Sequence, residues 1–113
     1  MNKKEIQKLK KKLEEEKKEI IETLKKLENE LEEVKSSVPS EQIEQAAYTE
    51  NLKYLNTQID RDKKKLEAIN ETIKRIDKNE FGRCVKCGVK IKDDRLKTLP
   101  TTLYCRKCAV LLK

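Results

Sequence analysis

Hydrophobic residues recur along the first two thirds of the chain at alternating intervals of four and three positions. One such series runs over residues 6–38 and a second over residues 48–76. Charged residues fill most of the positions between them. A 4-3 alternation kept over several heptads is typical of the contact stripe of a coiled coil. The pattern therefore predicts two long helices that pack against each other along a narrow apolar seam.

A short polar segment around Pro39 separates the two series. The residue before a proline avoids the α region, so the first helix is expected to end just before it. Ser40 is a suitable N-cap for a second helix that opens with Glu41. So short a link makes the helices antiparallel, and residue numbers that add up to 79 bring the two seams together. In that register the polar seam residues Lys17 and Asp62 face each other.

The composition limits the class of protein. Of 113 residues, 43% are charged, 35% are hydrophobic and 4% are aromatic, which is too little apolar volume for a large globular core. No stretch is long and apolar enough for a membrane span or a secretion signal, so a cytoplasmic protein that does not contact membrane is expected. The chain has no histidine, which removes the usual Ser-His and Cys-His nucleophiles. A binding protein is expected rather than an enzyme.

The net charge of +7 is unevenly distributed. Residues 36–50 contain three acidic and no basic side chains, whereas residues 81–113 contain nine basic and two acidic ones. The link between the two predicted helices is therefore acidic, and the last third of the chain is strongly basic.

Four cysteines form two C-x2-C pairs, Cys84 with Cys87 and Cys105 with Cys108, separated by 17 residues. This spacing is typical of a four-cysteine zinc site, because each pair directs two sulfurs at one ion. Four thiolates close the tetrahedral shell, so one Zn²⁺ with a structural role is predicted. Two disulfides, or an iron-sulfur or redox site, are the alternatives.

The cysteine spacing alone leaves the function of the finger open. GATA-type DNA-binding fingers share it, and the basic charge of the finger suits phosphate contacts. The spacer lacks tryptophan, however, so sequence-specific DNA recognition is not expected. A small DNA-binding zinc protein and a structural coiled-coil interaction module remain alternative functions.

The residues around the cysteines resemble the DksA/TraR zinc-finger family. Its pattern has an aromatic residue and glycine before the first cysteine pair, a glycine after it, and then Ile, Arg-Leu and Pro before the second pair. All of these elements occur here in that order, as Phe81-Gly82, Gly88, Ile91, Arg95-Leu96 and Pro100. In this family a long helical hairpin precedes the finger, and its tip carries Asp-x-x-Asp-x-Ala. The corresponding segment here, residues 41–46, has glutamates in place of both aspartates.

The resemblance implies a regulator that binds bacterial RNA polymerase directly and inserts the tip of its coiled coil through the secondary channel. It implies Glu41, Glu44 and Ala46 as the tip residues that act on the polymerase. The globular end would stay at the rim of the channel. Candidate rim or phosphate contacts are four of the basic residues of the finger: Arg83, Arg95, Arg106 and Lys107.

Family positions that hold basic residues for guanosine tetraphosphate correspond here to Ala68 and Leu99. Both are poor phosphate ligands, so a response to this nucleotide is not expected. The sequence as a whole predicts a mainly α protein, expected to be a monomer. It would consist of an antiparallel coiled-coil hairpin over residues 1–80, with an acidic tip near 38–46, and a C4 zinc-finger domain over 81–113.

Overall fold

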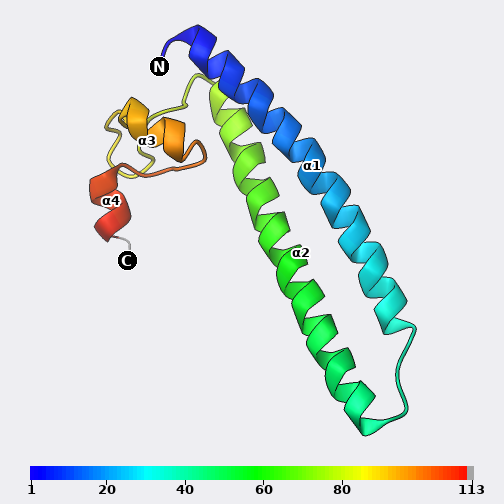
Figure 1. The fold of residues 1–113 in the computed structure, drawn as a ribbon. Helices are drawn as coiled ribbons and strands as arrows, with labels where there is room; N and C mark the ends of the chain where they lie inside the picture. The colour runs from blue at the N-terminus through cyan, green and yellow to red at the C-terminus, as the bar shows by residue number, and fades with distance from the viewer. Residues whose placement is uncertain (112–113) are drawn as a thin grey trace. The chain divides into compact units, whose positions relative to one another are not determined.

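The computed structural model describes residues 1–111, apart from the side chains of Gln42 and Ile43. Four helices follow one another along the chain (Figure 1): α1 (Lys3–Lys35), α2 (Gln42–Asp77), α3 (Asp93–Thr98) and α4 (Arg106–Leu111). Over the described residues no strand forms, and the one β-bridge joins Arg83 to Lys90. The predicted fold class is confirmed: two long helices joined by a short link, then a small four-cysteine region.

The chain divides into two compact units. Residues 16–67 form the first, which we call the hairpin unit. Residues 1–15 together with 68–113 form the second, which we call the finger unit. Both long helices contribute to both units. The functional division at residue 80 that the sequence suggests stays a prediction.

The core of the hairpin unit is aliphatic and comes from the predicted seam. Its buried members are Leu24, Leu31, Leu55 and Ile59. Each such side chain stabilises the folded state by about 1.5–3 kcal/mol relative to an exposed one. Further seam residues pack against this cluster while remaining partly exposed: Ile20, Leu27, Val34, Leu52 and Leu66.

The register of the two helices differs from the predicted one. In the hairpin unit the Lys63 ammonium lies 4.0 Å from the Glu28 carboxylate, and these numbers add up to 91. In the finger unit Lys10 donates a 2.7 Å hydrogen bond to Asp77, and these numbers add up to 87. These sums exceed the predicted sum of 79 by 12 and by 8, so the predicted register is wrong by at least one heptad.

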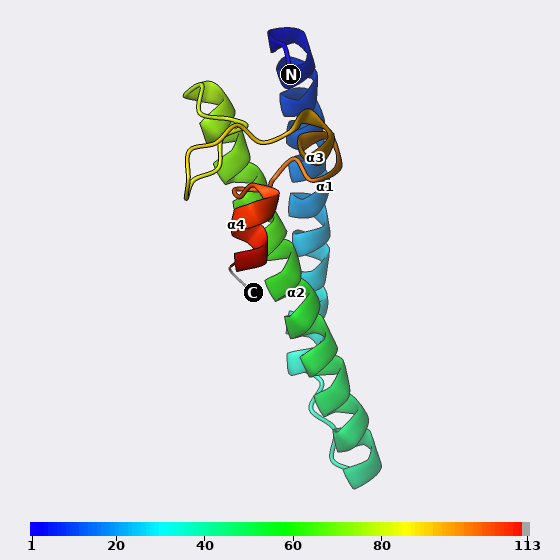
Figure 2. The same cartoon turned by 90° about the vertical axis from the view of Figure 1, so that its left-hand side faces the viewer.

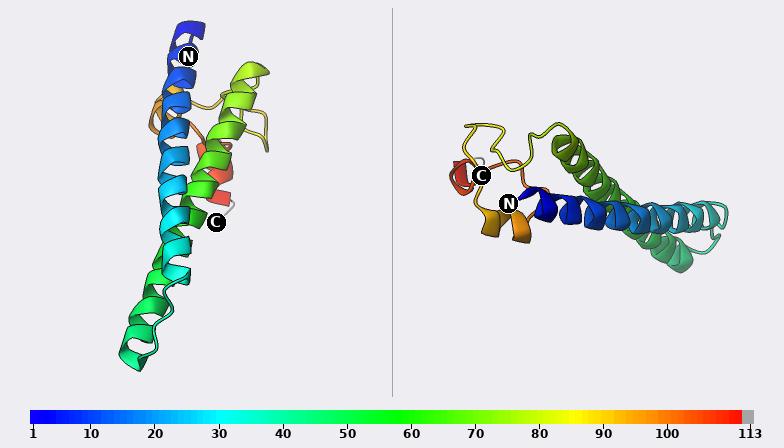
Figure 3. Two further views of the ribbon diagram at one scale, coloured as in Figure 1. Left: turned by 90° about the vertical axis from the view of Figure 1, so that its right-hand side faces the viewer. Right: turned by 90° about the horizontal axis from the view of Figure 1, so that it is seen from above.

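The connection between the helices explains this shift. It is extended, so that α2 begins beyond the last turn of α1 (Figures 1, 2 and 3). A seam that repeats every heptad still packs apolar residue on apolar residue after a shift of one heptad. Lys17 and Asp62 are both half-buried, but the shift moves them about two turns apart along the hairpin, so they do not face each other as predicted.

The finger unit has a separate core. Cys84, Ile91, Leu96 and Cys108 are its buried cluster. Four partly buried residues pack against them: Met1, Phe81, Tyr104 and Cys105. Two of the four cluster residues are thus metal-ligand candidates, so this cluster contains much less hydrocarbon than the core of the hairpin unit. Leu13, Ile69 and Ile76 are also buried in the finger unit but lie outside the cluster.

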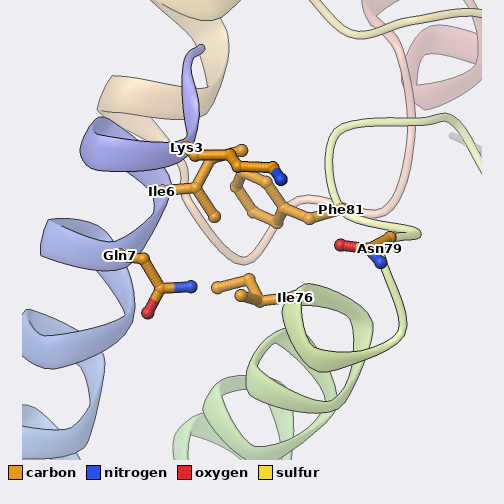
Figure 4. Close-up of a pocket in the computed structure, with 6 residues that line it drawn as sticks. All are labelled: Lys3, Ile6, Gln7, Ile76, Asn79 and Phe81. Carbon is orange, nitrogen blue, oxygen red and sulfur yellow. The ribbon is translucent and has the colours of Figure 1, made fainter.

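Within the finger unit, a cavity of about 340 Å³ lies where the start of α1 and the end of α2 meet the segment that follows α2. We call that segment, residues 78–83, the strap. Figure 4 shows Ile6, Ile76 and Phe81 pointing toward one another across it. Phe81 therefore packs on two sides, against the finger core and beside the helix ends. The complete lining is Lys3, Ile6, Gln7, Ile76, Asn79 and Phe81.

In the described part of the chain, no helix is long and apolar enough to cross a membrane.

Candidate metal centre and hairpin tip

The chain leaves α2 through a capped helix end that directs it into the finger. The Asn79 N–H donates to the Ile76 carbonyl, and the Glu80 N–H donates to the Arg75 carbonyl at 2.8 Å. Asn79 has a φ of 59°, the left-handed conformation that asparagine adopts more readily than most residues. This pair of hydrogen bonds is a Schellman motif, which ends the helix at a defined residue.

Arg75 fastens the strap that follows to the end of α2. Its Nη2 donates to the Glu80 carbonyl at 2.9 Å and to the Arg83 carbonyl at 2.8 Å. The planar guanidinium can hold two carbonyl groups at once because its donors are rigidly placed. Arg75 thus positions the residue that directly precedes Cys84. The sequence does not predict this role, because nothing in a helical pattern marks which arginine folds back.

The first cysteine pair sits in a tight backbone loop. The Cys84 N–H donates to the Val89 carbonyl, and the Gly88 N–H donates back to the Cys84 carbonyl, both at 2.9 Å. The Ile91 N–H donates to the Gly82 carbonyl at 2.7 Å and closes the base of the loop. Gly82 and Gly88 have φ values of 89° and 76°, in the region that favours glycine. The glycines on either side of the cysteine pair are therefore required by the backbone.

The second cysteine pair is formed by the start of a helix. Cys105 directly precedes α4, and Cys108 lies in its first turn. The Ala109 N–H donates to the Cys105 carbonyl at 2.9 Å. The Val85 N–H donates to the Leu103 carbonyl at 2.9 Å and so ties the first loop to the approach to the second.

These two loops bring all four sulfurs together. The Sγ atoms of Cys84, Cys87, Cys105 and Cys108 all lie within 4.8 Å of one another. The Cys87 and Cys105 sulfurs are 3.7 Å apart, much longer than the ~2.05 Å of a disulfide. A tetrahedral ZnS₄ site with Zn–S bonds of about 2.3 Å has sulfurs about 3.8 Å apart. The cluster therefore fits one zinc ion.

The thiols differ in exposure and acidity. Cys84 and Cys108 are buried, Cys105 is half-buried and Cys87 is exposed. Burial opposes ionisation of Cys84, but hydrogen bonds from backbone N–H groups, that of Cys105 first, outweigh it and lower the pKa of Cys84 to about 6. The hydrogen bond to Cys105, with burial, raises the pKa of Cys108 to about 12. Holding all four as thiolates therefore needs a cation between them, which a divalent zinc ion supplies.

The hairpin tip lies where α1 is joined to α2, near the middle of the hairpin unit's sequence. The hydroxyls of Ser36 and Ser37 both donate to the Glu33 carbonyl, at 2.9 and 3.0 Å, and satisfy the end of α1. The first α2 residue is Gln42, and the Gln45 N–H donates to the Glu41 carbonyl. Glu41 is therefore the capping residue, one position later than the predicted cap.

The predicted tip residues Glu41, Glu44 and Ala46 are all exposed. The side-chain amide of Gln45 donates to the Pro39 carbonyl at 3.3 Å, which links the first turn of α2 to the extended connection. The segment that carries the two glutamates is thus anchored by a hydrogen bond between residues of the tip itself. The sequence does not predict this contact, because it depends on how the connection runs past the helix.

Three of the four predicted basic contacts gather at one place in the finger unit. Arg95, Arg106 and Lys107 line a hollow of about 560 Å³, together with Lys90 and Lys92, which the sequence analysis did not single out. Arg83 does not line this hollow, and its Nη1 lies 3.5 Å from the Gly88 carbonyl. We call this feature the basic hollow.

Comparison with known proteins supports the assignment of the metal. Residues 79–110 match the family model described as "Prokaryotic dksA/traR C4-type zinc finger". The match contains all four cysteines, and the sulfur positions fit the same metal. The four cysteines hold one structural zinc ion.

Related sequences extend beyond the finger. An uncharacterized protein of Aquifex aeolicus is 39% identical over 113 residues, covering 96% of this chain and 77% of that protein. The "RNA polymerase-binding transcription factor DksA" of Escherichia coli K12 is 32% identical over 71 residues, covering 63% of this chain and 47% of that protein. The protein of the same name from Buchnera aphidicola is 35% identical over 77 residues, covering 68% and 51%. The aligned part spans about half the length of these DksA proteins.

The fold has a solved counterpart. The structure of "transcription factor DksA2 from Pseudomonas aeruginosa" matches with a TM-score of 0.83 and 22% identity, covering 98% of this chain and 84% of that one. At this identity the match concerns the fold. The hairpin, the four gathered sulfurs and the matched finger sequence agree, and the chain belongs to the DksA/TraR family of C4-type zinc-finger proteins.

Proposed function

We propose that this protein binds bacterial RNA polymerase directly and regulates transcription by placing its hairpin tip in the secondary channel. The observation that carries this proposal is the relationship to the curated DksA proteins, which are named as RNA polymerase-binding transcription factors. The shared fold and the zinc site support it. The proposed activity is that of a non-enzymatic regulator in the bacterial cytoplasm, acting as a monomer.

The working end in this proposal is the acidic tip. Glu41 lies just before α2 and Glu44 lies in its first turn, and both are exposed. Ala46 follows and is exposed as well. Two carboxylates presented by an anchored loop can interact with basic elements or with a bound metal ion of the polymerase. The zinc ion cross-links the two cysteine pairs of the finger. The four cysteines fill the coordination shell of that ion, which leaves no position on it for a substrate.

The first experiment measures binding to purified core RNA polymerase and zinc content on one preparation. The variant Glu41→Ala/Glu44→Ala should bind with an affinity within about threefold of the unchanged chain, because the finger contacts remain. It should lose its effect on transcription from a set of promoters in vitro. The matched control is Glu19→Ala/Glu22→Ala, two exposed glutamates with the same spacing on the flank of α1. This control should keep full activity.

Each outcome has a distinct meaning. A zinc-loaded chain that does not bind polymerase contradicts the proposed function as a whole. Normal transcriptional activity of the tip variant contradicts only the role of the tip. A loss of activity in both double variants shows that removal of any two hairpin charges suffices, which also contradicts the assignment of Glu41 and Glu44.

A further inference from the structure

The basic hollow collects positive charge from three separate parts of the finger. Lys90 and Lys92 come from the segment after the first cysteine pair, Arg95 from α3, and Arg106 and Lys107 from the start of α4. The sequence separates the first and last of these by 16 residues, so only the folded finger brings them to one cavity. At about 560 Å³ the hollow is large enough to receive several side chains.

The charge of the hollow limits what it can receive. Its lining has five cationic side chains and one acidic one, Asp94. Cys105 also lines it, and a zinc ion with four thiolates has a net charge of −2. The local balance is therefore near +2. That balance matches an occupant with a few carboxylates better than a highly charged polyphosphate, which the zinc site repels.

One cation of the hollow is already held in place. The Arg95 Nε donates to the Tyr104 carbonyl at 3.2 Å, and its Nη2 lies 3.5 Å from the Thr102 hydroxyl. These contacts use two of the five N–H donors of the guanidinium. A guanidinium fixed in this way loses little further freedom when its remaining N–H groups donate to a carboxylate, so Arg95 is a pre-organised donor.

The lining also has an apolar part. Val89 is 57% exposed, a high fraction for a valine beside a cavity, whereas its neighbour in the lining Ile91 is 2% exposed. Exposed aliphatic surface in a hollow that is also lined by five cations favours an occupant that carries an apolar residue flanked by acids. Such central apolar anchors with a charged rim are common in protein interfaces.

We propose that the basic hollow is the docking site of the finger for an acidic segment of RNA polymerase, with an apolar residue of that segment packed on Val89. This proposal rests on the proposed function and adds the surface of the finger that holds the enzyme. It assigns Lys90 and Lys92 to the interface beside the three basic residues that the sequence analysis selected. The tip then acts on the enzyme, while the hollow provides affinity.

The two cysteine pairs provide a matched test. Lys86 and Lys107 occupy the same position within their C-x2-C pairs, and both are exposed, but only Lys107 lines the hollow. Lys107→Glu should weaken binding to core polymerase about tenfold or more and flatten the salt dependence of the association rate. Lys86→Glu should change the affinity less than about twofold. Zinc stoichiometry and circular dichroism check that both variants remain folded.

A cross-linking measurement covers the case in which a charge reversal disturbs folding. Benzoylphenylalanine at position 89 should cross-link to a polymerase peptide rich in Asp and Glu. At position 85, where Val85 is 49% exposed outside the hollow, it should not. Equal effects of the two lysine variants, equal cross-linking at both positions, or a basic cross-linked peptide would each overturn the inference.

The outcomes also separate this inference from the proposed function. If the unchanged chain binds polymerase but the Lys107 variant and the cross-links give the negative results above, only the docking site is wrong. If the unchanged chain does not bind polymerase, both fail. A salt-dependent affinity for duplex DNA that both lysine variants weaken equally would indicate a DNA-binding finger and overturn the docking site as well.

Discussion

The hairpin unit and the finger unit are stabilised by different chemistry. The four buried residues of the hairpin core are all leucine or isoleucine. In the finger core, two of the four buried residues are cysteines whose sulfurs belong to the zinc site. Burial of hydrocarbon supports a hairpin without any ligand, whereas a small core of this kind depends on its metal. One chain thus combines a metal-independent hairpin core in the unit that presents the tip with a metal-dependent cluster around the cysteines, in the unit that presents the basic hollow.

The largest effect expected from this comparison is that of removing a zinc ligand. Cys84→Ser should abolish stable zinc binding and unfold the region from residue 80 onward, because a structural zinc site contributes about 10–16 kcal/mol. Segments 20–34 and 52–66 should keep slow hydrogen exchange, since no finger residue belongs to their core. Hydrogen exchange with mass spectrometry measures both. Val85→Ser, at an exposed neighbouring position, is the control, and unfolding of the two helix segments in the cysteine variant would contradict the comparison.

The reverse experiment weakens the hairpin and spares the finger. Leu55 is 1% exposed, and Leu55→Ala should lower the free energy of unfolding of the hairpin unit by about 2–5 kcal/mol. The neighbouring Tyr54 is 61% exposed, and Tyr54→Ala should change it by less than about 0.5 kcal/mol. Chemical denaturation followed by circular dichroism gives both values. Zinc content should stay at one ion per chain in each variant, and a loss of zinc from the leucine variant would show that the units depend on each other.

A smaller effect is expected where Arg75 holds the strap. Arg75→Ala removes two hydrogen bonds to backbone carbonyls and should cost about 1–3 kcal/mol in the finger unit. Zinc transfer to a chelator should become faster as a result. Arg75→Lys should not restore the slow rate, because the freely rotating ammonium lacks the rigid, planar N–H pair with which Nη2 meets both carbonyls. The exposed neighbour Lys74 provides the control through Lys74→Ala, and equal rates for the two alanine variants would exclude a special role of Arg75.

The smallest effect concerns the ion pair that reports the register. The hydrogen bond to Asp77 raises the pKa of Lys10 above its ordinary value of 10.5. The stabilisation by this pair is therefore fully present below pH 10.5 and is lost as the pH rises through the higher folded value. Asp77→Asn should bring the pKa of Lys10 back toward 10.5, as measured by NMR titration of the lysine ε-methylene signal. An unchanged Lys10 pKa would show that the two residues are not paired and would reopen the register.

The sequence predicts the zinc ligands and the hairpin core well. Cys84 and its three partners are predicted correctly as a group, because two C-x2-C loops can place four sulfurs around one ion whatever else the chain does. The seam residues Leu24 and Leu55 are predicted as core for a similar reason, since helical periodicity is a local property. Gly82 and Gly88 likewise match the backbone conformations that their loops need.

Tertiary structure decided the helix register and the contacts between residues that are distant in sequence. The heptad repeat is degenerate, so it cannot distinguish two registers that differ by one heptad, and the Lys10–Asp77 contact settles it. The fold-back of Arg75, the anchoring of the tip by Gln45 and the gathering of Lys90 and Lys92 beside Lys107 each require the folded path of the chain. By itself the sequence determined two amphipathic helices, an acidic link and a zinc site, because spacing and local charge encode them. Only the folded chain decided which basic residues share one hollow, because side chains distant in sequence meet there.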